Sequence, residues 1–252
     1  MKLFTLLLSI VLLIIGFSSC RDDDDEDKLK LLTEINLVDE DGAQSMILEY
    51  DSSNRITKLK HKWDLYYSKG YSEEIFTYSE DGFLEKVEDD NQHYEWFAYN
   101  GDSIFAERGV FMYKGYPDPA MMARDTLILN AKGLIIKMYS GIHYTLYEYD
   151  NNNLIEIVSY SSFCGKEYQS SKFVYGYDNS KSIFSNQITP KWYWVYKGGL
   201  VGHVGNNNWK TRQGGNYENV QRSYFIDAHG YPTGYKENEK IYKNAFKYKV
   251  IG

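Results

Sequence analysis

One pattern of apolar and polar residues returns along most of the chain. An apolar or aromatic strand end, often Tyr, is followed by a polar turn and then by an apolar strand start. Asn, Asp and Gly at the turn positions accept the positive φ of tight turns, and the flanking residues favour strands. Each copy therefore predicts one β-hairpin. The copies are Leu48–Ile56, Phe76–Leu84, Phe97–Asp102, Leu129–Leu134, Tyr147–Leu154, Tyr175–Asn179, Tyr196–Leu200 and Ile226–Tyr231.

The spacing of the copies predicts an antiparallel meander. Successive anchors are separated alternately by 28–30 and 19–21 residues; they are Tyr50, Tyr78, Tyr99, Leu129, Tyr149, Tyr177, Tyr196 and Ile226. We expect one edge of the sheet to carry uniform tight turns, and the opposite edge to alternate long and short loops. Two strands for each copy predict a single all-β domain of roughly 12–16 strands.

So many strands rarely stay open and flat, so we expect the sheet to curl into a barrel or half-barrel. A barrel that spans a membrane needs strands with one uncharged face. Strand 56–62 has lysines on one face and His61 on the other. Strand 83–90 has charges on both faces, with Lys86, Glu88 and Asp90 on one and Glu85 and Asp89 on the other. These patterns predict a soluble domain.

The first 19 residues have the pattern of a secretory signal peptide. Lys2 precedes an apolar run, Leu3–Phe17, and small residues lead to a cleavage point. An uncleaved transmembrane helix is the alternative. The run is shorter than the roughly 20 residues that cross a bilayer, and acidic residues follow it.

Ser18-Ser19-Cys20 resembles the bacterial lipobox, although Phe17 stands where Leu is usual. The resemblance implies that Cys20 is acylated and that two or three acyl chains hold the protein stably on a membrane. The run Arg21–Asp27 predicts a solvated acidic spacer. It also resembles the export signal of Bacteroidetes surface lipoproteins, which implies the outer face of the outer membrane. We therefore divide the chain into a signal peptide (1–19), a lipidated cysteine with an acidic linker (20–30) and a hairpin-repeat domain (31–252).

Charge and cysteine content narrow the choice of partners. The net charge is −7, and no basic stripe interrupts the acidic composition, which argues against a nucleic-acid partner. Besides Cys20, the mature chain has only Cys164, so an internal disulfide framework is excluded. We expect Cys164 to be a small packing residue.

Two resemblances to known families involve these features. The copy Tyr50–Thr57 resembles the YD repeat of Rhs-type shells. A stronger resemblance, from about residue 30 to the end, is to a family of Bacteroidetes surface lipoproteins of unknown function with a porin-like fold. The lipobox, the acidic spacer, the hairpin copies and the segments Tyr177–Asn186 and Asp227–Thr233 carry it. The family implies a strongly curved meander on the cell surface and supplies no established activity or catalytic residues.

No motif predicts a catalytic residue, a metal site or a cofactor. The histidines lie far apart without neighbouring metal ligands; they are His61, His93, His143, His203 and His229. Two facing carboxylates suffice for glycoside hydrolysis, and the chain has many candidates: Glu73, Glu74, Glu85, Glu88, Asp89, Asp90, Glu148 and Glu156. In an acidic β-protein such pairs also arise by chance on solvated faces.

Aromatic residues are the better lead. Residues 180–220 fit the repeat least, and we expect a long loop or a short helix there that covers one end of the curled sheet. The candidate ligand-binding residues in it are Trp192, Tyr193, Trp194 and Trp209. They either stack on sugar rings or fill the core as a plug. If the segment is extended, Trp192 and Trp194 project to the same side.

Three hypotheses about function follow. The leading one is a surface-anchored, non-catalytic binding module for a carbohydrate. The alternative is a structural or accessory lipoprotein that docks on an outer-membrane protein, which predicts a large exposed apolar patch. The third is a glycan-acting hydrolase, which requires an enclosed cleft with two converging carboxylates or a strongly shifted carboxyl pKa.

Overall fold

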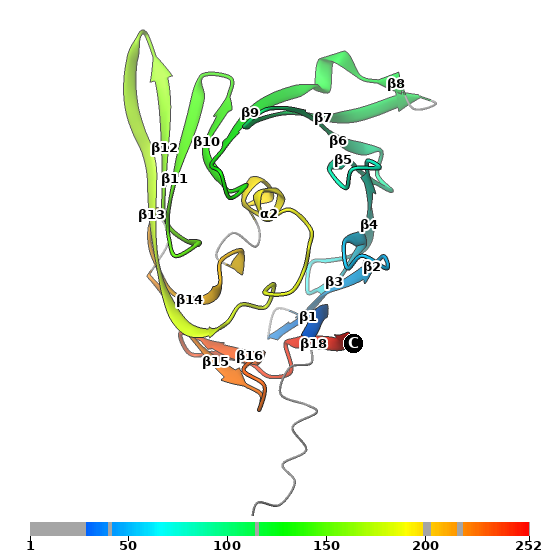
Figure 1. Cartoon of the computed structure of the whole chain (residues 1–252), viewed down its shortest axis with the longest axis vertical. Helices are drawn as coiled ribbons and strands as arrows, with labels where there is room; N and C mark the ends of the chain where they lie inside the picture. Colours follow the sequence, from blue (N-terminus) through cyan, green and yellow to red (C-terminus); the bar gives the residue numbers. More distant parts are fainter. Residues whose placement is uncertain (1–28, 40–41, 114–115, 199–202, 216–218, 252) are drawn as a thin grey trace, which may run out of the picture.

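The computed structural model describes residues 29–39, 42–113, 116–198, 203–215 and 219–251. Most of these residues form one antiparallel sheet of eighteen strands that curls around the helix α2 (Lys191–Lys197) without closing (Figure 1). Each strand pairs mainly with its neighbours in the chain, β7 pairs with β9 as well as β8, and β1 pairs with both β2 and β18. The expected all-β meander with one short helix is confirmed.

The strands in chain order are β1 (Leu29–Asp39), β2 (Gly42–Tyr50), β3 (Ile56–Leu65), β4 (Ser68–Tyr78), β5 (Leu84–Asp89), β6 (His93–Asn100), β7 (Ser103–Tyr113), β8 (Tyr116–Pro117), β9 (Ala123–Leu129), β10 (Ile135–Ser140), β11 (His143–Asp150), β12 (Asn153–Phe163), β13 (Lys166–Lys181), β14 (Asn207–Gly214), β15 (Val220–Ile226), β16 (Pro232–Glu237), β17 (Lys240–Tyr242) and β18 (Phe246–Ile251). A short 3-10 helix, η2 (Pro119–Met121), precedes β9. The strand count lies above the expected range because it includes β8 and β17, which have two and three residues.

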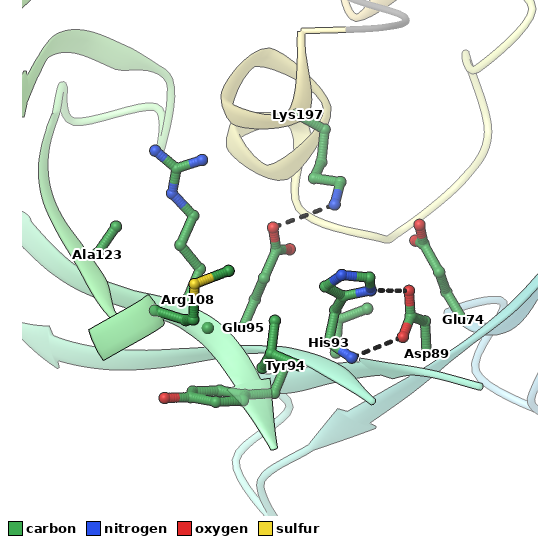
Figure 2. A pocket seen from close by; sticks show the side chains of 12 residues that line it. Glu74, Asp89, His93, Tyr94, Glu95, Arg108, Ala123 and Lys197 are labelled. Atoms are coloured by element: carbon green, nitrogen blue, oxygen red, sulfur yellow. Dashed lines mark hydrogen bonds and ion pairs between the residues drawn. The ribbon is translucent and has the colours of Figure 1, made fainter. Parts of the chain in front are cut away.

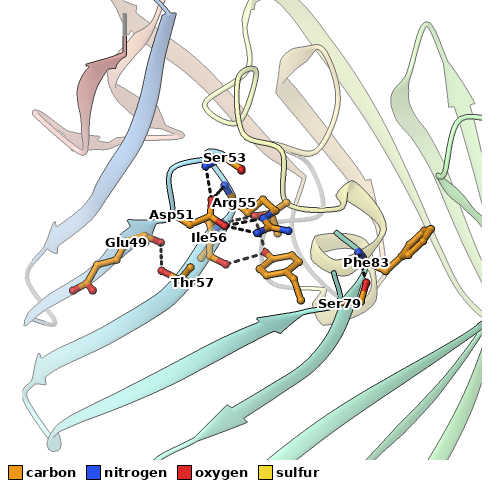
Figure 3. A network of polar contacts seen from close by, with 10 residues as sticks. Glu49, Asp51, Ser53, Arg55, Ile56, Thr57, Ser79 and Phe83 are labelled. Atoms are coloured by element: carbon orange, nitrogen blue, oxygen red, sulfur yellow. Dashed lines mark hydrogen bonds and ion pairs between the residues drawn. The ribbon is translucent and has the colours of Figure 1, made fainter. Parts of the chain in front are cut away.

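The repeated polar turns share a structure built on their first residue. In the turn between β2 and β3, the Asp51 carboxylate accepts hydrogen bonds from the backbone N–H groups two and four residues later, both at 2.9 Å (Figure 3). Asn54 in this turn has a φ of 61°. Asn130 and Asp227 cap their turns through the same two positions. The repeat therefore selects Asp or Asn at the first position, and Asn or Gly where φ is positive.

The tyrosine that precedes the turn in many copies connects the two strands of a hairpin. Its hydroxyl donates to a backbone carbonyl near the start of the preceding strand. The pairs are Tyr78 to Ile56 at 2.9 Å, Tyr99 to Leu84 at 2.9 Å and Tyr177 to Leu154 at 2.7 Å. Burial raises the pKa of Tyr78 to about 12. Tyr recurs at this position because its ring fills the core and its hydroxyl donates a hydrogen bond to a backbone carbonyl at the strand end.

Two copies do not form hairpins. Tyr175–Asn179 lies within the continuous strand β13, which runs on to Lys181 before the chain turns into the interior. Tyr196 lies in α2, and Gly198 ends that helix with a φ of 76°. A Gly after apolar residues marks a helix end as well as a hairpin turn, so the local pattern does not separate the two.

The alternating spacing has a different cause from the one expected. The strands of the β3–β4 hairpin have 10 and 11 residues, and those of the β5–β6 hairpin have 6 and 8. The same contrast separates β12–β13, with 11 and 16 residues, from β10–β11, with 6 and 8. Hairpins with long strands and hairpins with short strands therefore alternate. The expected alternation of long and short loops does not occur at these hairpins, because only a few turn residues join the strands in both kinds.

The inner face of the sheet carries the core. Phe76 of β4 and Val87 of β5 face each other there, and both are almost fully buried. The outer face carries ion pairs, such as that between Lys58 and Glu73 at 2.6 Å. Cys164 does not pack in the core; it lies exposed in the β12–β13 turn with a φ of 50°. The expectation that it is a packing residue is wrong, because the turn between two long strands projects beyond the sheet.

Candidate functional site

Helix α2 occupies the interior of the curled sheet (Figure 1). Its side chains pack against residues from distant parts of the chain. The Trp192 ring lies 4.9 Å from that of Phe97 on β6, and Trp194 stacks on Phe184 at 5.2 Å with the planes 8° apart. The helix therefore divides the space inside the sheet into two parts.

Three of the four predicted ligand-binding aromatics belong to this core. Trp192, Tyr193 and Trp194 have exposed fractions of 4%, 0% and 3%. These side chains therefore fill the core as a plug, which is the second of the two alternatives. The possibility that this segment is extended, with Trp192 and Trp194 on an exposed side, is wrong, because residues 191–197 form a helix enclosed by the sheet. Trp209 on β14 is also buried, but it borders an internal cavity. Ligand binding through these rings stays a prediction.

Acidic side chains from three strands hold the polar end of α2. The Lys197 ammonium lies 3.1 Å from Glu95 Oε1 on β6, as Figure 2 shows. The Tyr193 hydroxyl is 3.5 Å from a Glu74 oxygen on β4. The Tyr196 hydroxyl donates to Asp125 on β9 at 3.1 Å, outside the view of that figure. The helix position is thus fixed by charge and hydrogen bonds as well as by packing.

The two glutamates have shifted pKa values. Burial raises the pKa of Glu74 and of Glu95, and the positive charge of Lys197 opposes both rises. The negative charge of Asp89 adds to the rise of the pKa of Glu74, and that of Glu74 adds to the rise at Glu95. The ammonium group of Lys197 thus offsets only part of the free-energy cost of removing the two carboxylates from water.

These residues line a cavity of about 540 Å³, here named the Glu95 cleft. It is bordered by Glu74, Asp89, Glu95, Arg108 and Lys197, and His93 Nδ1 lies 2.8 Å from an Asp89 oxygen (Figure 2). Two converging carboxylates are the feature that a hydrolase requires. Here one oxygen atom of each glutamate contacts a side chain of the helix, so this pair serves to hold α2 in place.

A second cavity, of about 520 Å³, lies on the other side of α2 and is named the Trp209 cavity. Inner faces of strands β10–β16 form much of its wall, which is mainly aromatic and aliphatic. Arg212 and Arg222 contribute guanidinium groups, and none of the described residues that line the cavity is Asp or Glu. The cavity therefore combines apolar walls with positive charge.

Arg222 is held rigidly at this cavity. Its guanidinium carbon lies 3.9 Å from the ring centroid of Trp209 and 4.4 Å from that of Tyr235. Its Nε pairs with Glu237, and Nη1 lies 3.2 Å from Nε2 of His203. Burial lowers the pKa of His203 well below its usual range, and the charge of Arg222 lowers it further. The imidazole is therefore neutral and accepts from the guanidinium.

The sequence patterns did not single out Glu95, Arg212, Arg222 or His203 as site residues. Each is an isolated polar residue, three of them within strands and His203 within the irregular segment. Strand alternation places Arg222 and Tyr224 on one face, but it does not tell whether that face is the interior. Burial of a charge is decided by the curl of the sheet and by the position of α2.

The remaining predictions concern metals and the anchor. No group of three or more potential metal ligands occurs among the described residues. In the same part of the chain, no helix has the length and apolar character needed to cross a membrane. Cys20 and the acidic spacer lie outside the described residues, and acylation of Cys20 stays a prediction.

Comparisons with known proteins address the fold. The chain is similar to a porin-like protein from Bacteroides uniformis, with a TM-score of 0.52 and 13% sequence identity over 89% of this chain and 98% of that one. A porin-like protein from Bacteroides vulgatus aligns with a TM-score of 0.37 and 12% identity over 88% of this chain and 98% of that one. No protein-family model and no curated protein matches. The first similarity shows that the chain has a porin-like fold.

Proposed function

We propose that this protein is a surface-anchored, non-catalytic binding module that holds a sugar-sized ligand in the Trp209 cavity. The observation that carries the proposal is the cavity itself, about 520 Å³ in volume with aromatic walls. Small-molecule sites are usually concave, mostly apolar and roughly 300–1,000 Å³ in volume, with a few polar groups that orient the ligand. The Trp209 cavity meets each of these conditions.

The polar groups of the cavity suit a ligand with hydroxyl groups. Thr145 Oγ1 and Ser159 Oγ lie 3.1 Å apart on neighbouring strands and both line the cavity. Tyr147 and Tyr175 line the same space, and burial raises the pKa of both phenols, which therefore keep their protons. A sugar presents apolar C–H faces and hydroxyl edges, which match aromatic walls with interspersed hydroxyls.

The anchoring part of the proposal rests on the sequence. The described chain begins at Leu29, which pairs with Ile251 at the edge of the sheet that carries the Asp51-type turns. A Cys20→Ser variant is expected to lose fatty-acid incorporation and to leave the membrane fraction. Proteolysis of intact cells then tests whether the protein faces outward, and protection of the wild-type protein contradicts that orientation.

A glycan array tests the binding part. The wild-type protein should bind a subset of glycans, and a blank array overturns the proposal. Trp209→Ala should reduce binding at least tenfold, whereas Trp96→Ala, on the outer face, should bind as the wild type does. Circular dichroism verifies the fold of both variants. Ser159→Ala removes one cavity hydroxyl with little loss of packing, so it also reduces affinity if the ligand lies in this cavity.

A second candidate function is docking on an outer-membrane protein. One observation favours it: exposed apolar side chains occur at several hairpin ends on the edge opposite Leu29. They are 62–92% exposed and comprise Val38, Tyr66, Tyr67, Met112, Tyr116, Ile142 and Phe163. Exposed apolar groups often mark protein interfaces. Co-purification of a membrane protein with the wild type, but not with a Tyr67→Ser/Phe163→Ser variant, supports docking; a wild-type monomer in solubilised membranes contradicts it.

A further inference from the structure

A smaller cavity continues the Trp209 cavity along the inner face of the sheet. It has a volume of about 290 Å³, is bordered by Gln44, His61 and Trp63, and is named the Trp63 pocket. Ile35 and Leu37 of β1 line both cavities. Because β1 pairs with β18 on one side and with β2 on the other, it joins the two parts of the wall. The two cavities therefore meet at β1.

We infer that the sugar unit in the Trp209 cavity belongs to an oligosaccharide, and that this chain crosses β1 and places a further unit on the indole of Trp63. The inference rests on the proposed function and names the class of its ligand. Three features of the Trp63 pocket support it: the surface beneath the indole, the polar groups beside it and its distance from β1.

The indole of Trp63 rests on the backbone of Gly70, which lies directly opposite on β4. A Cβ atom on residue 70 would overlap with three neighbouring atoms of the indole, Cζ2, Cε2 and Cη2. Glycine within a strand often marks the close approach of another group. One side of the indole thus lies on the sheet, and the partly exposed ring borders the pocket with the remainder of its surface. An apolar sugar face can stack there.

Polar groups beside the indole suit the hydroxyl groups of a sugar. Gln44 lies opposite Trp63 on β2, and His61 precedes Trp63 by two residues on the same face of β3. Nε2 of His61 is buried and has no hydrogen-bond partner among the residues that the structure describes. Burial and the charge of Lys197 lower the pKa of this imidazole, so it is neutral at pH 7. A bound hydroxyl group would supply the missing hydrogen bond and recover its free-energy cost.

The register of the strands gives the distance from β1 to Trp63. Leu37 of β1 is paired with Gln44 of β2, and Gln44 is paired with Trp63 of β3. Neighbouring strands lie roughly 4.8 Å apart, so the backbones of Leu37 and Trp63 are about 10 Å apart. A monosaccharide in the Trp209 cavity does not extend to Trp63 over this distance, whereas an oligosaccharide does.

The volume of the Trp63 pocket also favours an extension over a separate site. Small-molecule sites usually have volumes of roughly 300–1,000 Å³. The Trp63 pocket, at about 290 Å³, lies at the lower limit of this range, whereas the Trp209 cavity lies well within it. We therefore expect the Trp63 pocket to add affinity for a longer ligand without binding a monosaccharide by itself.

The experiment measures affinity against chain length, by calorimetric titration of the purified full-length chain in detergent. The probes are the series from glucose to maltotetraose, the series from N-acetylglucosamine to chitotetraose, and the mono- to tetrasaccharide fragments of any glycan that binds on the array. In at least one series, affinity should rise about tenfold from the monosaccharide to the tetrasaccharide. Trp63→Ala should abolish this rise and keep the monosaccharide affinity of the wild type, whereas Trp209→Ala should lose affinity at every length.

Two further variants accompany Trp63→Ala. Trp96→Ala, which removes a partly exposed indole from the outer face, is the matched control and should keep the whole rise. Gln44→Ala removes the amide beside Trp63 and leaves the indole in place, so it should lose part of the rise. Circular dichroism verifies the fold of each variant.

The outcomes separate the inference from the proposed function. If Trp63 only covers Gly70, Trp63→Ala loses stability but keeps the rise, and the inference is overturned. Equal affinity at all chain lengths also overturns it and leaves the proposed function standing. Loss of monosaccharide affinity in Trp63→Ala overturns it as well, because the first unit is then bound at Trp63. A blank result with every probe and on the array overturns both.

Discussion

The two cavities beside α2 have nearly the same volume, about 540 Å³ and 520 Å³, and different electrostatic character. In the Glu95 cleft, three acidic side chains face two cationic ones, and Lys197 of the helix pairs with Glu95. In the Trp209 cavity, two arginines line aromatic walls with no acidic residue among the described lining. One helix thus supplies a cation to the acidic side and only uncharged groups to the cationic side.

The difference separates a structural site from the proposed ligand site. Glu74 and Glu95 of the Glu95 cleft each have a partner on α2, so their role in the empty protein is to hold the helix. The Trp209 cavity has two arginines and no carboxylate among its described lining residues, and its volume is large enough for a ligand. Size alone does not separate the two cavities, whereas the charges of their lining residues do.

The largest expected effect comes from removing a core side chain of α2. Trp192→Ala removes a buried indole from the helix, and we expect the free energy of unfolding to fall by about 3–5 kcal/mol. Urea denaturation measures the change. Tyr67→Ala, at a 92% exposed hairpin end, should cost about 1 kcal/mol or less. Equal losses in the two variants contradict the plug role of α2.

A smaller effect is expected from removing the cation of the acidic side. Without Lys197, the rise of the pKa of Glu95 that burial causes is opposed by the hydrogen bond with Tyr193 and no longer by a positive charge. In Lys197→Met we expect a loss of about 1–2 kcal/mol at pH 8, because the ion pair is partly exposed and screened by solvent. A carboxyl whose pKa is raised in the folded state stabilises that state below its unfolded pKa, and the contribution is lost as pH rises through the folded value. The loss should therefore be smaller at pH 5.

Lys191→Met provides the control for that variant. Burial lowers the pKa of Lys191 on the same helix, so loss of its charge should not destabilise the protein. Urea midpoints of both variants at pH 5 and pH 8 give the comparison. A Lys197→Met loss that is independent of pH contradicts the assigned role of Glu95.

Glu74→Gln should act in the opposite direction. The raised pKa of Glu74 means that its charged form is unfavourable in the folded protein. An uncharged amide of the same shape should raise the free energy of unfolding by about 1 kcal/mol at pH 8. The gain should vanish at pH 4, where the glutamate of the wild type is neutral like the glutamine of the variant. Glu73→Gln, next to it on the outer face, should lower stability at pH 8, because Lys58 and Tyr71 lower the pKa of Glu73. Thermal unfolding at the two pH values measures both.

The smallest effect is expected from the repeated tyrosine, which occurs on both sides of α2. Tyr78→Phe on the Glu95 side and Tyr177→Phe on the Trp209 side each remove one hydrogen bond to a strand-end carbonyl. Each should cost about 0.5–1 kcal/mol in chemical denaturation. Tyr66→Phe, at an exposed hairpin end, should change nothing measurable. A large difference between the first two variants contradicts a common role for the repeated tyrosine.

The sequence by itself determined the repeating elements. Asp51 and Asn54 specify a turn through one side-chain oxygen and one positive φ, and both are local properties of a few residues. Tyr78 follows from the same repeat, since a strand end needs an aromatic ring for the core and a hydroxyl for the neighbouring carbonyl. The all-β meander and the irregular segment near α2 were predictable because they depend on such local chemistry, whereas the porin-like fold was implied by the family resemblance.

Only the tertiary structure decided what lies inside. Trp192 and Trp194 could stack on a ligand or fill a core, and the choice depended on α2 entering the curled sheet. Arg222 became part of a cavity because the curl of the sheet turns this face of β15 inward, where Trp209 of β14 and Tyr235 of β16 contact its guanidinium. The burial of a side chain and the charges around it depend on segments from different parts of the chain. The repeat specifies each hairpin locally, so it contains no information about which side chains the curled sheet brings together.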